Sequence, residues 1–378
     1  MRDDRVPVPG EEGEFEGDER IYVASQWQLT WWKFRKHQLA KVSGILLILI
    51  YLSAIFCECL APYDPNTYSA ACIYAPPQQM RFVDSQGRWH WRPFVYGYRR
   101  EIDPDTLRKV YMPDEGKIYP IYFFTRGQPY KMWGFWQTDV HLMSVKEGSL
   151  FLWGADRMGR DLFSRVLYGS RISTSIGLIG VFISFVLGVM IGGFSGYLGG
   201  VFDVIVQRLI EFLRSIPTTP LWMGLSAALP PHWPPLRVYF GITVILSLMS
   251  WTDLARVVRS KFLSLREEEF VVAARLAGAS EFRIVFRHMA PSFLSHIIAS
   301  ITLSIPGMIL GETSLSFLGL GLRPPVVSWG VLLQEAQNVR SVALAPWLLL
   351  PGLMVIVTVL AFNFLGDGLR DAADPYSR

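Results

Sequence analysis

Residues 256–291 read RVVRSKFLSLREEEFVVAARLAGASEFRIVFRHMAP, and this stretch decides how the chain is organised. It lies between two long apolar runs, far from either end of the chain, and it is too charged to sit in lipid. It contains two helix-favouring alanines, Ala273 and Ala274, followed by Gly278 and Pro291. A compact, helical, basic segment held between two membrane spans predicts a surface that is offered to a cytoplasmic partner.

Composition sets the class of protein. The 378 residues are 51% hydrophobic and only 18% charged, which in a chain with long apolar runs indicates a polytopic membrane protein. The three cysteines, Cys57, Cys59 and Cys72, have no disulfide or metal-site spacing and are expected to be packing residues. Because the chain lacks a GxxxxGK[ST] phosphate loop, an HExxH motif and a GxSxG elbow, we expect no catalytic residue, cofactor or metal in it.

Six membrane-spanning helices are predicted, and the fold class is an all-α polytopic membrane protein. The first span covers residues 42–60, enough to cross ~30 Å of hydrocarbon. Glu58, near its outer end, is expected to snorkel to the interface. The other five spans are predicted at residues 172–197, 209–229, 238–254, 293–313 and 345–365.

The third span, 209–229, is interrupted by charges and prolines. Glu211 and Arg214 are three residues apart, a spacing that lets them pair on one helix face. Charges at that depth must face protein or water, so this pair is a candidate for the transport pathway. Pro217 and Pro220 are expected to kink or break the helix there.

Basic residues set the orientation. Because the segment 256–291 is rich in arginine and the loops on the other side are not, the positive-inside rule predicts that this segment and both termini are cytoplasmic. Residues 1–25 are expected to form a disordered cytoplasmic tail, and residues 369–378 a second tail. Residues 26–41 mix tryptophans with lysines and arginines, as is typical of an interfacial helix.

The region 61–151 is then an extracytoplasmic insert. It is rich in aromatics and turn residues, and runs such as 117–125 predict strands, so a small β-rich insert is expected between the first and second helices. Its role stays open between a lid on its own protein and a contact surface for an external partner or substrate. Residues 160–170 and 328–340 are amphipathic and predict short helices at the outer interface.

From about Trp153 to its end, roughly 60% of its length, the chain resembles the inner-membrane permease subunits of ABC importers for dipeptides, oligopeptides and nickel. It is most similar to the second, six-span permease of the pair. The resemblance rests on five stretches that occur in order: GADRMGRDLFSRVLYGSRIS, GYLGGVFDVIVQRLIEFLRSIP, VVAARLAGASEFRIVFRHMAP, ETSLSFLGLGLRPPVVSWGVLLQEA and PWLLLPGLMVIVTVLAFNFLGDGLRDAADP. It implies a type I ABC importer permease fold, with a core at residues 152–368.

Within that core, 256–291 resembles the EAA motif through which such permeases couple to their ATPases. The resemblance implies an ATPase-coupling role for the four residues that match: Ala273, Ala274, Gly278 and Pro291. Val272, His288 and Ala290 depart from the motif, while three acidic residues lie one turn upstream and complete the candidate set: Glu267, Glu268 and Glu269. Glycine at 278 suits a helix end, and proline at 291 suits the start of the next membrane helix.

The resemblance implies a permease subunit of the bacterial inner membrane that forms a translocation pathway for peptides. Its partners would be a homologous permease, two cytoplasmic ATPases that carry ATP and magnesium, and an extracytoplasmic substrate-binding protein. The same role for oligosaccharides or nickel stays an alternative. A self-contained secondary transporter or channel that uses Glu211 and Arg214 is an alternative of another class, and a membrane enzyme is a third.

Overall fold

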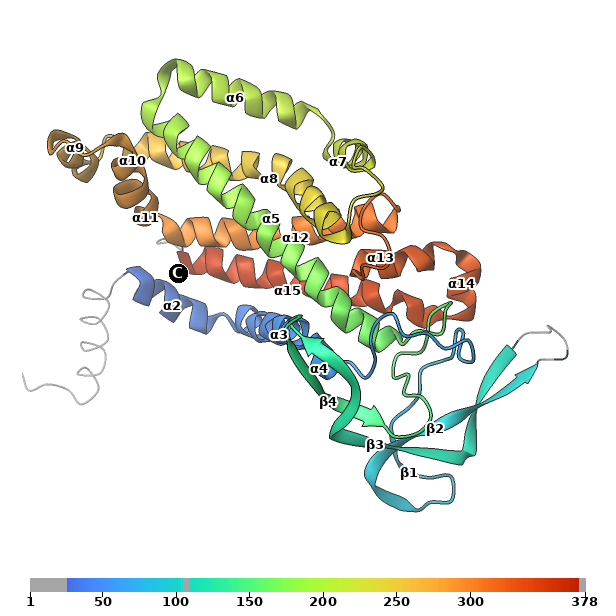
Figure 1. Cartoon of the computed structure of the whole chain (residues 1–378). Coiled ribbons are helices and arrows are strands. Elements are labelled where there is room, and N and C mark those ends of the chain that lie inside the picture. The colour runs from blue at the N-terminus through green and yellow to red at the C-terminus, as the bar shows by residue number, and fades with distance from the viewer. Residues whose placement is uncertain (1–25, 103, 105–108, 374–378) are drawn as a thin grey trace, which may run out of the picture.

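The computed structural model describes residues 26–102, 104 and 109–373. The expected tail at 1–25 and the last five residues of the expected tail at 369–378 lie outside the described residues. Figure 1 shows a bundle of long helices with a β-sheet projecting from one end and the short helix α9 at the opposite end. The sheet and α9 therefore lie on opposite sides of the helical layer.

Five helices in the described part of the chain are long and apolar enough to cross a membrane. They are α3 (Gln38–Ile55), α5 (Leu162–Leu198), α8 (Pro235–Leu265), α12 (Leu294–Phe317) and α15 (Leu350–Ala373), the last preceded by the 3-10 turn η3 (Pro346–Leu349). At 1.5 Å per residue, α5 is about 55 Å long and extends beyond the ~30 Å hydrocarbon layer.

The predicted third span, 209–229, is two shorter helices instead of one. α6 (Gly200–Ser215) is followed by its C-cap Ile216, and α7 (Thr218–Ala227) begins after Pro217. Ile216 is extended because the ring of the following proline disfavours helical backbone there. Neither helix is long enough to span by itself, so the described residues contain five long membrane helices where six were predicted.

The central contact of the bundle joins α5 to α8 through small residues. A side chain added at Gly192 would lie 2.3 Å from the carbonyl oxygen of Ala255, and one added at Gly196 would lie 2.6 Å from that of Arg259. Glycine is therefore needed at both positions, because only its bare backbone lets the two helices approach so closely.

Several predicted boundaries are corrected. The helix expected at 26–41 ends earlier, as α2 (Gln26–Lys36), because the His37 imidazole accepts a hydrogen bond of 3.1 Å from the Ala40 backbone and caps the start of α3. The helix expected at 160–170 is the first part of α5. Residues 369–373, assigned to a tail, continue α15.

The amphipathic piece at 328–340 is divided among three elements. They are α13 (Trp329–Gln334), the 3-10 turn η2 (Glu335–Gln337) and α14 (Val339–Leu344). The apolar face of α13 is buried against the helices, with Trp329 fully covered. This helix is thus part of the packed core, and the prediction of a separate helix at the outer interface is wrong.

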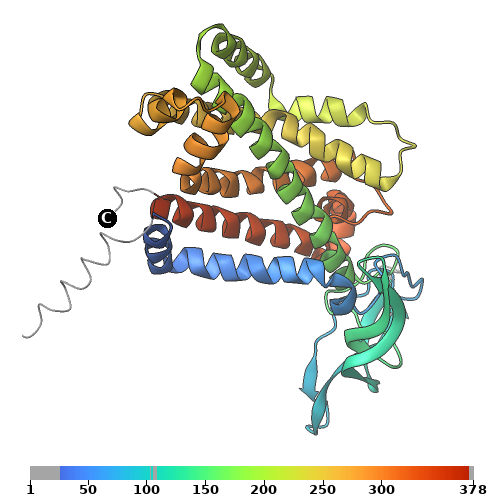
Figure 2. The ribbon, with the colours of Figure 1, turned by 60° about the vertical axis from the view of Figure 1, so that its left-hand side comes forward.

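The insert contains the expected β-structure. Its four antiparallel strands follow chain order: β1 (Arg81–Val83), β2 (Trp89–Ile102), β3 (Lys109–Met132) and β4 (Trp136–Val145). Val95, Ile121 and Leu150 form a small core beneath it. Figure 2 shows the sheet beyond the end of the bundle, next to α4 (Cys57–Leu60). The β-rich insert predicted between the first two spans is confirmed.

Glu58 of α4 does not snorkel as expected. Its carboxylate is buried and forms an ion pair of 2.5 Å with the Arg171 guanidinium of α5. The same guanidinium donates to the backbone oxygens of Ala54 and Ile55 at the end of α3. The pair ties the end of the first span to the start of the second and satisfies a charge that would otherwise be costly to bury.

Candidate functional site

The segment 256–291, called the coupling segment below, contains the end of α8 and four short elements. They are α9 (Glu269–Leu276), α10 (Glu281–Arg283), the π-helical turn η1 (Ile284–Met289) and α11 (Ala290–Ser292). Val271 of α9 and Val285 of η1 are fully buried against a cluster that includes Phe262 of α8. The segment is therefore held on the bundle by its own apolar side chains, so its position follows the positions of α5 and α8.

Gly278 ends α9 in the way the sequence predicted. Its φ is +76°, in the left-handed region that glycine adopts without strain. Its N–H donates to the Arg275 carbonyl, and the Ala279 N–H donates to the Ala274 carbonyl. These two bonds are the Schellman pattern, which satisfies carbonyls at a helix end. The prediction of a helix stop at this glycine is confirmed.

The three predicted acidic residues lie around the N-terminus of α9. Glu268 is the N-cap residue, Glu269 is the first helical residue, and Glu267 pairs with Arg266 at 3.3 Å. All three are exposed, and negative charge at this position is favoured by the helix dipole. They stabilise the helix start while their carboxylates face outward.

The other matched residues differ in exposure. Ala273 is exposed, whereas Ala274 is half-buried and packs against the core cluster beneath α9. Pro291 lies in α11, three residues before the start of α12 at Leu294. The prediction that Pro291 begins the membrane helix is thus wrong by about one turn, because Phe293 interrupts the helix between them.

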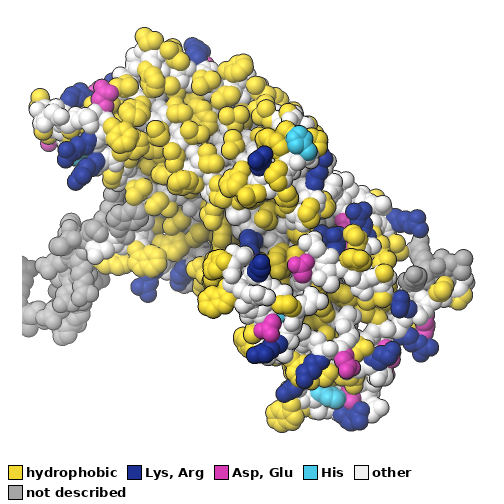
Figure 3. Space-filling model, viewed as in Figure 1, with side chains coloured by type: hydrophobic (Ala, Val, Ile, Leu, Met, Phe, Trp, Pro, Cys, Tyr) yellow, Lys and Arg dark blue, Asp and Glu magenta, His cyan; other side chains and the backbone are white. Residues whose placement is uncertain are grey.

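Exposed apolar side chains on the coupling segment were not found from the sequence. Leu276 is 84% exposed and Phe282 is 60% exposed, and Phe270 and Val272 are also exposed. Figure 3 shows a broad hydrophobic surface over the helices, with Lys and Arg gathered near the α9 end. The exposed apolar residues of the coupling segment lie among these charges, outside the broad hydrophobic surface of the helices. Their exposure to water is unfavourable unless a partner protein covers them.

The predicted pair of Glu211 and Arg214 does not form. Glu211 pairs with Arg208 at 2.6 Å on the same helix, and Arg214 pairs with Asp253 of α8. Glu211 and Arg214 nevertheless line one cleft of about 340 Å³ together with Arg256. Arg214 and Asp253 also line a neighbouring cleft of about 250 Å³. The two residues therefore contribute to a polar face between α6 and α8, each with a different partner from the one expected.

A second link between α6 and α8 was not found from the sequence. The Arg259 guanidinium donates two hydrogen bonds of 2.5 Å to the two carboxylate oxygens of Asp203. These bonds lower the pKa of Asp203. Arg259 also lines a larger cleft of this face, about 710 Å³, with Lys261 and His296. The bidentate pair fixes α6 across the end of α8 and helps to form the polar face.

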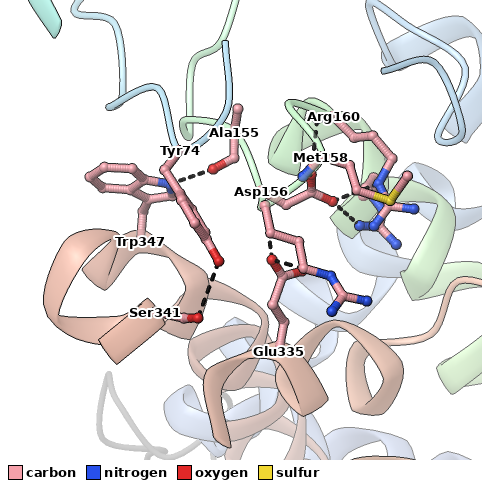
Figure 4. Close-up of polar contacts among 10 residues, drawn as sticks. Tyr74, Ala155, Asp156, Met158, Arg160, Glu335, Ser341 and Trp347 are labelled. Carbon is pink, nitrogen blue, oxygen red and sulfur yellow. Dashed lines mark hydrogen bonds and ion pairs between the residues drawn. The ribbon is translucent and has the colours of Figure 1, made fainter. Parts of the chain in front are cut away.

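At the opposite end, the stretch GADRMGRD, residues 154–161 and called the outer loop below, buries its two carboxylates, and Figure 4 shows the contacts of Asp156. The Asp156 carboxylate accepts from the Arg160 backbone at 3.0 Å, from its guanidinium at 2.7 Å, and from Arg165 of α5. Asp161 caps α5 by accepting from the Ser164 backbone at 2.8 Å. Burial raises the pKa of Asp161 to about 7.

The outer loop also holds the segment after α12. The Arg157 backbone donates to the Glu335 carboxylate at 2.8 Å, and the Trp347 indole donates to the Ala155 carbonyl at 2.9 Å. Tyr74 of the insert shares a hydrogen bond of 3.1 Å with Ser341. Figure 4 shows these contacts side by side, so insert, outer loop and C-terminal helices form one connected unit.

Glu312 of α12 is a buried carboxylate that joins the helices near the outer loop. Its carboxylate accepts from three hydroxyl groups: Ser173 at 3.1 Å, Ser316 at 2.8 Å and Ser328 at 2.6 Å. These serines belong to α5, α12 and the N-cap of α13, so one side chain joins three helices. Among the described residues, no group of three or more His, Cys, Asp or Glu is arranged to hold a metal ion.

Comparison with known proteins identifies the family. Residues 188–378, half of the chain, match the family described as binding-protein-dependent transport system inner membrane component, and residues 25–77 match the N-terminal TM domain of oligopeptide transport permease C. The chain belongs to this family of transport permeases. It is an ABC importer permease subunit and a multi-pass inner-membrane protein, as the resemblance implied.

Three individual matches illustrate the relationship. The oligopeptide transport system permease protein OppC of Haemophilus influenzae is 40% identical over 64% of this chain and 76% of its own length. The dipeptide transport system permease protein DppC of Bacillus subtilis is 38% identical over 60% and 68%. A structure of the MetNI methionine ABC transporter, in inward facing conformations, matches 56% of this chain and 98% of its own with 17% identity and a TM-score of 0.44.

Proposed function

We propose that this permease subunit lines a pathway for peptides and transmits the movements of two cytoplasmic ATPase subunits to it. A homologous permease would complete the pathway, and an extracytoplasmic binding protein would deliver the cargo. ATP and magnesium would be bound by the ATPases, so this chain has a mechanical role. Peptide is the proposed cargo because the matched relatives are named for oligopeptide and dipeptide transport.

The observation that carries the proposal is the exposed surface of the coupling segment. Leu276 and Phe282 point apolar groups outward, and the acidic residues at 267–269 surround the start of the same short helix. Proteins bind such mixed surfaces by burying the apolar centre and pairing the charged rim. An ATPase groove that received α9 would cover these side chains.

Transmission through the segment follows from its anchoring. Val271, Ile284 and Met289 are buried beneath α9 and η1, against side chains of α5 and α8. Since packed interiors resist deformation, a displacement of α9 would move these membrane helices with it. The Asp203–Arg259 pair would carry the movement on to α6.

The polar face between α6 and α8 is the proposed wall of the pathway. Arg214, Asp253 and Arg256 line its clefts, together with the indole of Trp222 at one end. Charged groups at membrane depth are tolerated where they face water or a partner subunit. In this proposal the homologous permease faces these residues and the cargo passes between the two chains.

The sidedness is part of the proposal. The coupling segment and both termini would be cytoplasmic, and the sheet would lie outside, where it could meet the binding protein or cover the pathway. The hydrogen bond between Tyr74 and Ser341 joins the insert to the helices. A displacement of the sheet by a bound partner would therefore be transmitted to the helical bundle.

The decisive experiment is ATP hydrolysis by the copurified complex in lipid, with its binding protein, in the presence of peptides, oligosaccharides or nickel. Stimulation by peptides only is the expected result. Stimulation by another cargo would overturn the peptide assignment and keep the coupling role. Purification without any ATPase subunit, together with transport driven by an ion gradient, would overturn the coupling role itself.

A further inference from the structure

The turn that joins β3 to β4 presents three exposed aromatic side chains. Trp133 is 44% exposed, Phe135 is 75% exposed and Trp136 is 64% exposed. Side chains of this size are costly to leave in water when they are clustered. The turn therefore needs an occupant on its outer side.

The backbone of the turn is held in an unusual conformation. Trp133 has a φ of +51° and Gly134 a φ of +83°, and the Phe135 N–H donates to the Met132 carbonyl at 3.3 Å. Turn positions with positive φ favour asparagine, aspartate or glycine. Tryptophan is uncommon at positive φ, so its presence there points to a function for the side chain.

The tryptophan is fastened to the end of the first membrane span. Its indole N–H donates to the Ile55 carbonyl at 2.9 Å, where α3 ends, and its backbone N–H donates to the Glu58 carboxylate at 3.3 Å. Its ring lies 5.9 Å from the ring of Phe56 and 6.0 Å from that of Phe135. A continuous row of aromatic rings thus runs from the end of α3 to the turn.

This row continues the exposed apolar side of the first membrane span. The exposed side of α3, an apolar span of a membrane protein, includes Leu49, Leu52 and Ile55, each at least 44% exposed. Figure 1 shows the β3–β4 hairpin next to α4, directly after α3. The charged pair of Glu58 and Arg171 at the same level marks where the span leaves the hydrocarbon.

We propose that the β3–β4 turn is a membrane anchor, which places Trp133, Phe135 and Trp136 in the headgroup region of the leaflet on the sheet side. Tryptophan rings are enriched at that depth because one part of the ring is apolar and the N–H is polar. Lys131, exposed beside the turn, can direct its ammonium to lipid phosphates. The anchor fixes the insert relative to the bilayer and does not depend on which cargo is carried.

The test places an environment-sensitive fluorophore on the turn of the assembled complex in nanodiscs of phosphatidylcholine and phosphatidylglycerol. The label is attached to Phe135→Cys after Cys57, Cys59 and Cys72 have been replaced by alanine. Quenching is measured with lipids that carry a nitroxide near the headgroup and with aqueous iodide. The matched control is Trp91→Cys on β2 of the same insert, where the side chain is 94% exposed.

Severalfold stronger lipid quenching at position 135 than at position 91, with weaker iodide quenching, is the expected result. Equal quenching at both positions would overturn the proposal, because the turn would then be in water. Protection of position 135 from both quenchers would also overturn it and would indicate a protein occupant. If Phe135→Cys does not assemble, Trp136→Cys provides the same measurement.

Discussion

The outer loop and the coupling segment are both polar stretches next to membrane helices, yet they use their polar groups in opposite ways. In the outer loop, Asp156 and Asp161 are buried and bonded within the chain. In the coupling segment, Glu267 and Leu276 are exposed, the first bonded only to an adjacent arginine. A polar segment whose partners lie inside the chain stabilises the fold, whereas one that faces outward is available to another protein.

The largest expected effect is the removal of the central carboxylate of the outer loop. In Asp156→Ala, the Arg165 guanidinium would stay buried without its partner, which costs about 3–5 kcal/mol of unfolding free energy. Thermal unfolding in detergent should show a large fall in melting temperature. The matched control is Arg157→Ala, since the Arg157 side chain is 63% exposed and approaches the Glu335 carboxylate only at 4.0 Å, while the hydrogen bond to Glu335 is made by the backbone. Equal melting temperatures for the two variants would contradict the conclusion that the buried carboxylate of the outer loop stabilises the fold.

The next effect is a dependence on pH that arises at Asp161. Because the folded protein holds this carboxyl at a pKa of about 7, against 3.8 when unfolded, the folded state binds the proton more tightly. Stability from this group is full below about pH 4 and falls by up to about 1.4 kcal/mol per unit as the pH rises to 7. Asp161→Asn should remove this slope from melting curves recorded between pH 5 and 8. An unchanged slope in the variant would show that other groups cause it.

Local rules predicted those parts of the molecule that depend on neighbouring residues. Gly278 as a helix stop follows from the backbone freedom of glycine, and the sheet follows from runs of aromatic residues between turns. Hydropathy alone predicts the long membrane spans. The exception is the third predicted span, 209–229, which is divided at Pro217 into the separate helices α6 and α7.

Long-range pairing could not be predicted in the same way. Glu211 and Arg214 have a suitable spacing, but Arg214 binds Asp253 from a helix 39 residues away. Exposure was equally hidden, since Val271 and Leu276 are similar apolar residues on one short helix, yet one is fully buried and the other 84% exposed. Both outcomes are set by how helices that are distant in sequence pack together.

A smaller effect is expected at the end of α9. No atom lies within 4 Å of a side chain added at Gly278, so Gly278→Ala would cause backbone strain alone, roughly 1–2 kcal/mol. Hydrogen exchange in α9 should become faster, and transport should fall because the helix is less often in its binding conformation. Gly278→Asn is the control, because asparagine tolerates positive φ. Identical behaviour of the alanine and asparagine variants would argue against the cap as the cause.

The smallest effect on stability is expected for a substitution on the exposed face of α9, which should nevertheless reduce transport strongly. Leu276→Asn changes an exposed side chain, so the unfolding free energy should shift by no more than about 0.5 kcal/mol. Copurification of the ATPase subunits and ATP-driven uptake should nevertheless be lost, because an apolar contact at the centre of the proposed interface is removed. Val339→Asn is the matched control, since Val339 of α14 is an apolar side chain with 82% exposure on the opposite side of the bundle. If both variants kept their ATPases, α9 would not be the docking helix. If both variants lost them, the defect would lie in assembly of the complex. Exposure of an apolar side chain would then not distinguish a docking surface from the rest of the molecule.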